Sequence, residues 1–183
     1  MKLWQLPKSA EIGGKTYPIH TDFREILEII GYLNDPALPE FVRWRIALAL
    51  FYEGRIPPEH RAEAMDWFSR FLRCGQPDTP GPKLLDWEQD AGAILSGVNA
   101  VAGQEVRQLS YVHWWTFFSW FSAIGQGELA VLVSLRDKLS RGQKLEPWEQ
   151  EFYRQNRSRV DLRPRYTPAE EAERARLNGM LNG

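Results

Sequence analysis

Three acidic residues cluster in the stretch LDWEQD at positions 85–90. On a helix, Asp86 and Asp90 lie four residues apart and share one face, whereas Glu88 lies elsewhere. Paired carboxylates can ligate a metal ion, but the glycine and the ligand spacing of a calcium loop are missing. Acids are also favourable at the start of a helix, where the helix dipole is positive. We therefore interpret Asp86 and Asp90 as capping acids, with Asp86 starting the helix, and predict no metal site.

Arg136 is the second residue whose position indicates a specific interaction. It follows Val133 by three residues and Leu132 by four, within the apolar stripe of a predicted helix. A guanidinium in such a stripe needs a carboxylate partner, or it must extend past the edge of the core. We predict a structural ion pair between Arg136 and either Asp90 or Asp86.

The three histidines and the single cysteine form no catalytic pattern. His20, His60, His113 and Cys74 lack the spacing of zinc ligands, and the sequence contains no GxSxG, HExxH or phosphate-binding glycine loop. His113 precedes two tryptophans at the start of a predicted helix, where we expect it to cap the helix or to donate or accept a hydrogen bond. The sequence therefore predicts no catalytic, cofactor-binding or metal-binding residue, and a protein that is not an enzyme.

A basic segment is the remaining candidate for binding. Residues 154–165 contain five arginines and one acid, Asp161, and Tyr153 and Tyr166 flank them. Arginine suits phosphate and tyrosine can stack on bases, so one interpretation is a nucleic-acid contact. The other interpretation, which we favour, is a solvated linker, because three glutamates at positions 170, 171 and 173 offset the charge. The arginines of this candidate patch are Arg154, Arg157, Arg159, Arg163 and Arg165.

Composition narrows the class of protein. A chain of 183 residues, 43% of them hydrophobic, can form a real core without disulfides or metal. Its 23 basic and 24 acidic residues give a net charge of −1, which argues against nonspecific attraction to DNA or acidic membranes. A lone cysteine and the lack of a signal pattern favour a reducing cytoplasm. No apolar run approaches the roughly 20 residues that cross a bilayer.

Apolar periodicity predicts a mainly α-helical fold with a small β-hairpin at residues 10–19, where Gly13-Gly14 can form a tight turn. We expect a single compact bundle of about six to seven helices. The predicted central helix is HWWTFFSWFSAI, residues 113–124, with aromatic residues on one side and small residues on the other, covered by neighbours all round. Its core residues are Trp114, Phe117, Phe118 and Phe121.

The same periodicity predicts which residues are buried elsewhere. The helix after Pro39 is expected to bury Phe41, and the helix that starts at Pro147 is expected to bury Trp148. Replacing Phe118 by Ala should cost about 3–5 kcal/mol. We place a helical core domain at residues 1–153, and an arginine-rich linker with a polar C-terminal helix at residues 154–183.

The order of several motifs resembles the phage "gene product fifteen" family, whose genes lie among the tail genes of long-tailed phages. The resemblance covers residues 10–160 and ends with a helix that contains Arg136. Its motifs are YPIHTDFREILEI at 17–29, LALFYEGRIPPEH at 48–60, LDWEQDAGAI at 85–94 and HWWTFF at 113–118.

This resemblance implies a tail assembly chaperone. Such a protein binds the long, helix-prone tape measure protein and keeps it soluble while tail tube subunits polymerise around it. The resemblance also implies the tail tube protein as a further partner, self-association, no cofactor, and action in the host cytoplasm with absence from the mature virion. Two alternatives remain: a structural protein of the tail or head–tail connector, and a small nucleic-acid-binding helical module. We expect the partner-binding surface on the first three helices or the C-terminal tail.

Overall fold

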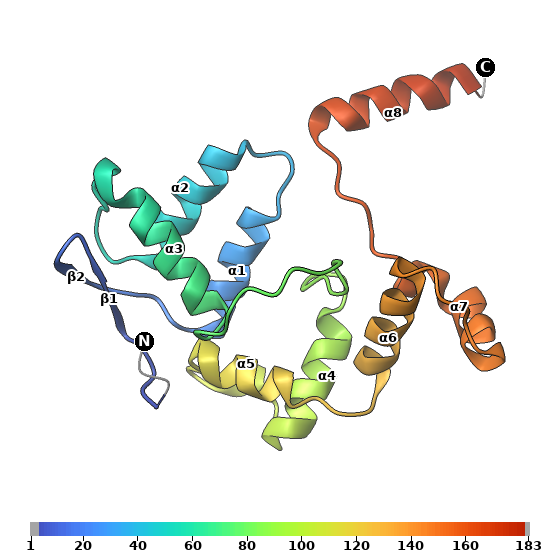
Figure 1. The fold of residues 1–183 in the computed structure, drawn as a ribbon, viewed down its shortest axis with the longest axis horizontal. Coiled ribbons are helices and arrows are strands. Elements are labelled where there is room, and N and C mark those ends of the chain that lie inside the picture. The colour runs from blue at the N-terminus through green and yellow to red at the C-terminus, as the bar shows by residue number, and fades with distance from the viewer. Residues whose placement is uncertain (1–3, 182–183) are drawn as a thin grey trace. The chain divides into compact units, whose positions relative to one another are not determined.

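The computed structural model describes residues 4–181 and is mainly α-helical, with an antiparallel β-hairpin near its start (Figure 1). The mainly helical fold and the hairpin are therefore confirmed. The strands are β1 (Ser9–Ile12) and β2 (Lys15–Pro18). The α-helices of the described residues are α1 (Phe23–Leu33), α2 (Glu40–Phe51), α3 (Arg61–Leu72), α4 (Ala91–Ala102), α5 (Trp114–Ser122), α6 (Glu128–Ser140), α7 (Pro147–Val160) and α8 (Pro168–Leu181). Two short 3₁₀ turns, η1 (Pro58–His60) and η2 (Val106–Gln108), precede α3 and α5.

The chain divides into two compact units. The first unit contains Thr21–Phe23 and Arg70–Arg163, and the second contains Pro7–His20 and Arg24–Ser69 together with the segment from Pro164. The boundary that we placed between residues 153 and 154 falls inside α7. The division into residues 1–153 and 154–183 stays a prediction.

In the second unit, the hairpin packs one face against the end of α2. Gly13 and Gly14 have φ angles of +56° and +74°, the left-handed values that a two-residue primed turn requires. Strand alternation turns Ala10, Ile12 and Tyr17 inward, and the Tyr17 ring meets the Tyr52 ring edge-on at 6.3 Å. The hairpin thereby closes one end of the unit.

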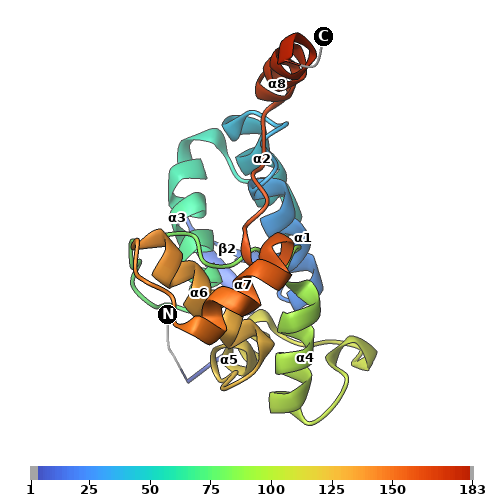
Figure 2. The ribbon, with the colours of Figure 1, turned by 90° about the vertical axis from the view of Figure 1, so that its right-hand side faces the viewer.

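Helices α2 and α3 lie side by side in this unit (Figure 2). Phe51 and Phe68 are fully buried, with ring centroids 4.5 Å apart, and Trp44 meets Phe68 edge-on at 6.5 Å. The predicted burial of Phe41 is wrong, because its side chain is 65% exposed. Periodicity identifies the inward face of α2 but not the point along the helix where the neighbouring helix ceases to cover it.

The first unit is built on α5. Trp114 and Phe117 are buried, and the Phe117 ring stacks on Phe23 at 4.4 Å with an interplanar angle of 6°. The indole N–H groups of Trp114 and Trp115 each donate a 3.0 Å hydrogen bond, to the carbonyls of Leu72 and Phe71 respectively. Carbonyls in the last turn of a helix lack partners within that helix, so Trp114 satisfies the Leu72 carbonyl, and Trp115 shares the Phe71 carbonyl with the Cys74 backbone N–H.

The predicted covering of α5 on all sides is wrong. Ser119, Ser122 and Ala123 are exposed, and Phe118 and Phe121 are only partly buried, with the Trp87 ring 4.9 Å from Phe121. The small residue that permits close approach lies instead on α4. A Cβ placed on Gly97 would come within 2.7 Å of the Ile124 side chain. Ser119 and Ser122 of α5 face solvent, whereas Thr116 is half-buried.

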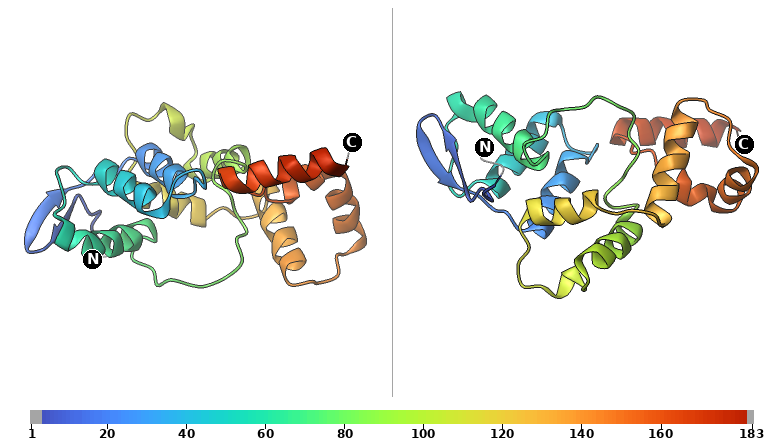
Figure 3. Two further views of the ribbon diagram at one scale, coloured as in Figure 1. Left: turned by 90° about the horizontal axis from the view of Figure 1, so that it is seen from above. Right: turned by 60° about the horizontal axis from the view of Figure 1, so that its bottom comes forward.

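The rest of this unit is a chain of contacting helices, in which α4 contacts α5 and α6, and α6 contacts α7 (Figure 3). The predicted burial of Trp148 is wrong, because it is 57% exposed. Its neighbour Glu149 is buried instead, where it accepts a 2.6 Å hydrogen bond from Lys138 of α6 and a 2.8 Å bond from the Glu146 backbone N–H. The capping box at the start of α7 therefore decides which residue faces inward.

Candidate partner-binding groove

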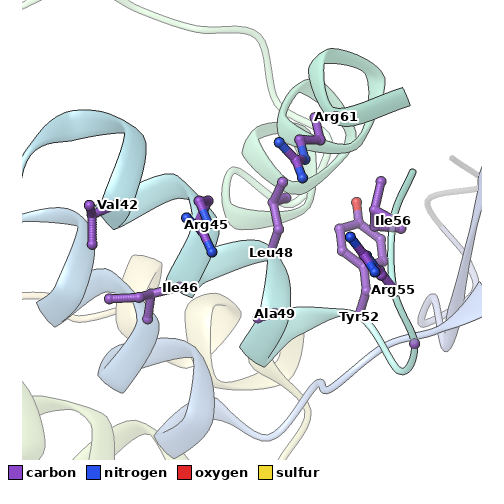
Figure 4. Close-up of a pocket in the computed structure, with 10 residues that line it drawn as sticks. Val42, Arg45, Ile46, Leu48, Ala49, Tyr52, Arg55, Ile56 and Arg61 are labelled. Atoms are coloured by element: carbon purple, nitrogen blue, oxygen red, sulfur yellow. The ribbon is translucent and has the colours of Figure 1, made fainter. Parts of the chain in front are cut away.

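A groove follows α2 in the second unit. Its larger part has a volume of about 760 Å³, and an adjoining part of about 370 Å³ shares Arg45, Leu48 and Arg61 with it. We call the two parts together the α2–α3 groove. The larger part is lined by Val42, Arg45, Ile46, Leu48, Ala49, Tyr52, Gly54, Arg55, Ile56 and Arg61 (Figure 4). The smaller part is lined by Glu40, Phe41, Trp44, Arg45, Leu48, Arg61 and Met65.

Helical spacing explains the apolar floor of the groove. Phe41, Trp44, Leu48 and Tyr52 follow one another at steps of three or four residues, so α2 and its end bring them to one side. Leu48 and Tyr52 are buried, Trp44 is half-buried and Phe41 is mostly exposed. The apolar stripe is therefore increasingly open to solvent towards the start of α2.

The segment after α2 forms one end of the groove. Gly54 has a φ of +107°, a left-handed value that lets the chain turn out of α2 towards Pro57. The Tyr52 hydroxyl donates a 2.8 Å hydrogen bond to the Ala64 carbonyl of α3. This bond and the buried side chain of Ile56 hold the end of α2 against α3, and so fix this end of the groove.

Arginine side chains border this apolar floor. Arg45, Arg55 and Arg61 are all exposed, and in Figure 4 Leu48 projects from α2 between Arg45 and Arg61. Within residues 4–181, none of the three forms a hydrogen bond or ion pair through its side chain. Glu40 is the single carboxylate among the lining residues. The groove is therefore apolar at its floor and positively charged at its edge.

The residues predicted to form ion pairs or helix caps, Asp86, Asp90, His113 and Arg136, all lie in the first unit. The Arg136 guanidinium forms a bidentate ion pair with Asp90, with Nη1–Oδ2 and Nη2–Oδ1 distances of 2.6 and 2.9 Å. Its remaining N–H groups donate to the carbonyls of Val160, Leu84 and Arg159 at 2.7, 3.0 and 2.8 Å. All five donors of the guanidinium are used, so this cluster holds the chain together and leaves no donor for a ligand.

Asp86 is buried beside this pair but has other partners. It accepts a 2.8 Å hydrogen bond from Lys83 and two 3.1 Å bonds from the backbone N–H groups of Glu88 and Gln89. Helix α4 begins at Ala91 rather than next to Asp86, which corrects the predicted start of the helix. Asp86 instead caps the tight turn that leads into α4.

His113 is the N-cap of α5. Its Nδ1 accepts a 3.0 Å hydrogen bond from the Trp115 backbone N–H, and its side chain is buried. A ring nitrogen that accepts this bond carries no proton, so the neutral ring is protonated at Nε2. This arrangement gives His113 a structural position at the start of α5.

Three of the five arginines of the candidate basic patch are paired with carboxylates of the same chain. Arg154 pairs with Glu151 at 2.6 Å, Arg157 pairs with Asp161 at 3.1 Å, and Arg159 pairs with Glu128. The backbone N–H of Arg163 donates to Gln89, and Arg165 also has an interaction within the chain. Residues 154–160 belong to α7, so this part of the segment is helical rather than a linker. Paired guanidinium groups offer less net charge to phosphate than free ones do.

The described residues also offer no evidence for a reactive cysteine, a metal site or a membrane span. Burial raises the pKa of the Cys74 thiol to about 12, so the thiol stays protonated at neutral pH and is a poor nucleophile. Residues 4–181 contain no group of three or more His, Cys, Asp or Glu side chains placed to hold a metal ion. None of their helices combines the length and the apolarity that a membrane span needs.

Comparison with known families decides what kind of protein this is. The family model described as "Bacteriophage Gp15 protein" matches residues 4–162, which include the hairpin and all helices from α1 to α7. The chain belongs to the bacteriophage Gp15 protein family. The resemblance drawn from the sequence is thereby confirmed, and the chain is a phage protein. Searches of curated proteins and of solved structures found no match.

The Gp15 match includes both the α2–α3 groove and the Arg136–Asp90 pair, whereas α8 lies outside it. Sequence reasoning did not single out Arg45, Arg55 or Arg61. A usable signal was present, because Arg45 follows Trp44 within the apolar pattern of α2, and Arg55 and Arg61 flank the Pro57-Pro58 turn. Only the packing of α3 beside α2 shows that the three arginines border one groove.

Proposed function

We propose that this Gp15-family protein is a tail assembly chaperone that binds the tape measure protein in the host cytoplasm. The observation that supports this proposal is the α2–α3 groove, with its open apolar floor. A long, helix-prone client presents amphipathic helices, and a hydrophobic groove beside a helix is a recurring way to bind them. The groove lies on two of the first three helices, where the partner surface was expected.

The groove also suits transient binding. Phe41 is 65% exposed and lies at the open end of the groove, so the free protein carries apolar surface that a client helix can cover. Several copies bound along one long client would act together and raise the overall affinity without tighter individual contacts. A chaperone that must dissociate when tube subunits arrive needs individually weak contacts, which can be released one at a time.

Co-expression with the tape measure protein of the same genome tests the proposal. We expect a soluble complex that can be isolated by affinity purification, and a client that is insoluble when expressed alone. A client that remains insoluble with no complex formed contradicts the proposal. Stoichiometric amounts of this protein in purified virions also contradict it, and favour a structural role in the tail or connector.

A matched pair of variants locates the binding surface. Phe41→Ala should reduce recovery of the complex while changing the free energy of unfolding by no more than about 0.5 kcal/mol, because the side chain is mostly exposed. Leu50→Ala is the control, since Leu50 is 40% exposed on the same helix but does not line the groove. Equal loss of complex in both variants would place the interface elsewhere.

A further inference from the structure

We infer that the α2–α3 groove selects amphipathic helices that carry carboxylates beside their apolar face. This inference rests on the proposed function and names the chemical class of client segment that the groove binds. It follows from the charges that border the groove and from the way these charges differ from the other charges of the chain.

The groove carries an excess of positive charge. Three arginines and one glutamate line it, and the arginines have no side-chain partner within residues 4–181. Many other exposed arginines of the chain are paired with a nearby carboxylate. Examples are Arg107 with Glu105, Arg141 with Asp137 and Arg176 with Glu173. The groove is therefore a place where arginine charge is left available to a partner.

The positions of the charged residues along the groove predict the orientation of a bound helix. Arg45 and Arg61 line both parts of the groove, whereas Arg55 lines only the larger part, and Glu40 lines only the smaller part with Phe41. The Arg55 end is thus cationic and the Glu40 end is apolar with one acid. A bound helix should place its carboxylates over the Arg55 end and its largest apolar side chains over the Phe41 end.

Arginine suits this task for two physical reasons. Its aliphatic stem covers apolar surface while the guanidinium reaches the water at the edge of the groove. The guanidinium then presents paired N–H donors that fit a carboxylate bidentately, which gives both energy and geometric selection. An acidic amphipathic helix satisfies both parts of the side chain, whereas a basic helix would meet three uncompensated positive charges.

The chain's own C-terminal helix is a poor match to this groove. In α8, Glu170 is held in a capping box with Thr167, and Glu173 is paired with Arg176. Its carboxylates are therefore partly engaged, and Arg174 and Arg176 add positive charge. These observations favour a helix of another protein as the occupant.

Two synthetic peptides test the inference with the full chain. Both are 18-residue helices with Leu at i, i+3, i+4 and i+7, and they differ only in carrying Glu or Lys beside the Leu stripe. By fluorescence anisotropy at low salt, the Glu peptide should bind about tenfold more tightly, a difference that shrinks as salt rises. Equal affinity of the two peptides would overturn the inference.

Charge-reversal variants assign the effect to the groove. Arg45→Glu should abolish the preference for the Glu peptide, whereas Lys144→Glu, an equal change of charge at an exposed residue outside the groove, should retain it. Equal effects of the two variants would show that the preference for the Glu peptide depends only on the net charge of the protein, and would overturn the inference. A concentration-dependent dimer that Arg45→Glu disrupts would assign the groove to a second copy of the chain, and would also overturn it.

The two proposals can fail separately. If the tape measure protein forms no complex but the Glu peptide binds selectively, the chaperone function fails and the selectivity of the groove stands. If a tape measure complex forms, depends on Phe41 and is unchanged by Arg45→Glu, the chaperone function stands and the selectivity for acidic helices is wrong.

Discussion

Arg136 of α6 and Asp90, the residue before α4, form a buried bidentate ion pair, with N–O distances of 2.6 and 2.9 Å. The two side chains are 5% and 2% exposed. Because the same guanidinium donates to the carbonyls of Leu84, Arg159 and Val160, this pair links α6 to the loop before α4 and to the end of α7. The free energy of desolvating the two charges offsets much of their attraction, so the intact pair adds little net stability. Removing either partner alone is costly, because the other charge is then left buried without a counter-charge.

Asp90→Ala should therefore lower the free energy of unfolding by about 3–5 kcal/mol, because it leaves a buried guanidinium without its counter-charge. Chemical denaturation followed by circular dichroism measures this change. Asp137→Ala is the matched control, since it removes a carboxylate from the exposed pair with Arg141 and should cost less than about 1 kcal/mol. Similar losses in the two variants would show that the buried pair has no special role.

Phe117→Ala should cost about 3–5 kcal/mol, since Phe117 is fully buried and stacks on Phe23. The sequence assigned this cost to Phe118, but Phe118 is only partly buried, so Phe118→Ala should cost distinctly less. Thermal melting of the two variants compares them directly. A larger loss at Phe118 than at Phe117 would contradict the burial of Phe117 against Phe23.

Two glycines of α4 should respond in opposite ways to alanine. Gly97→Ala brings a Cβ within 2.7 Å of Ile124 and should destabilise the protein by about 1–3 kcal/mol, despite the better helix propensity of alanine. Gly92→Ala meets nothing within 4 Å, so it should be neutral or stabilise by up to about 1 kcal/mol. Unfolding curves of both variants measure the difference. Equal shifts would mean that α4 does not approach Ile124 closely.

The Glu149–Lys138 pair should make the protein sensitive to acid. The hydrogen bond from Lys138, with that from the Glu146 backbone N–H, lowers the pKa of Glu149 below its ordinary value of 4.5. A carboxyl whose pKa is lowered by folding stabilises the folded state above its unfolded pKa, and the contribution is lost as pH falls through the folded pKa.

Glu149→Gln should accordingly be less stable than the unmodified protein at pH 7, with the difference disappearing at pH values well below 4.5. Melting temperatures recorded from neutral pH into acid measure this. Lys138→Met removes the other partner and should weaken the same pH dependence. A difference between the unmodified protein and Glu149→Gln that stays constant across the pH range would contradict the prediction.

Local sequence patterns determined the class of fold. The Gly13-Gly14 turn, the capping signal Thr167-Pro168 with Glu170, and the helical periodicity of apolar residues each depend on neighbours a few positions away. Such interactions require no knowledge of the rest of the chain. The need of Arg136 for a carboxylate was also visible, because a guanidinium within an apolar stripe is unfavourable without a partner.

Tertiary structure decided everything that depends on which elements meet. From the sequence, Asp86 and Asp90 are equally good candidates to pair with Arg136. Only Asp90 does so, because the Asp86 carboxylate accepts hydrogen bonds from Lys83 and from the backbone of the turn before α4. Phe41 fits the apolar pattern of its helix as well as Leu48 does, yet only Leu48 is buried. Periodicity assigns a side to each residue, whereas burial and the α2–α3 groove depend on where the neighbouring helix begins and ends.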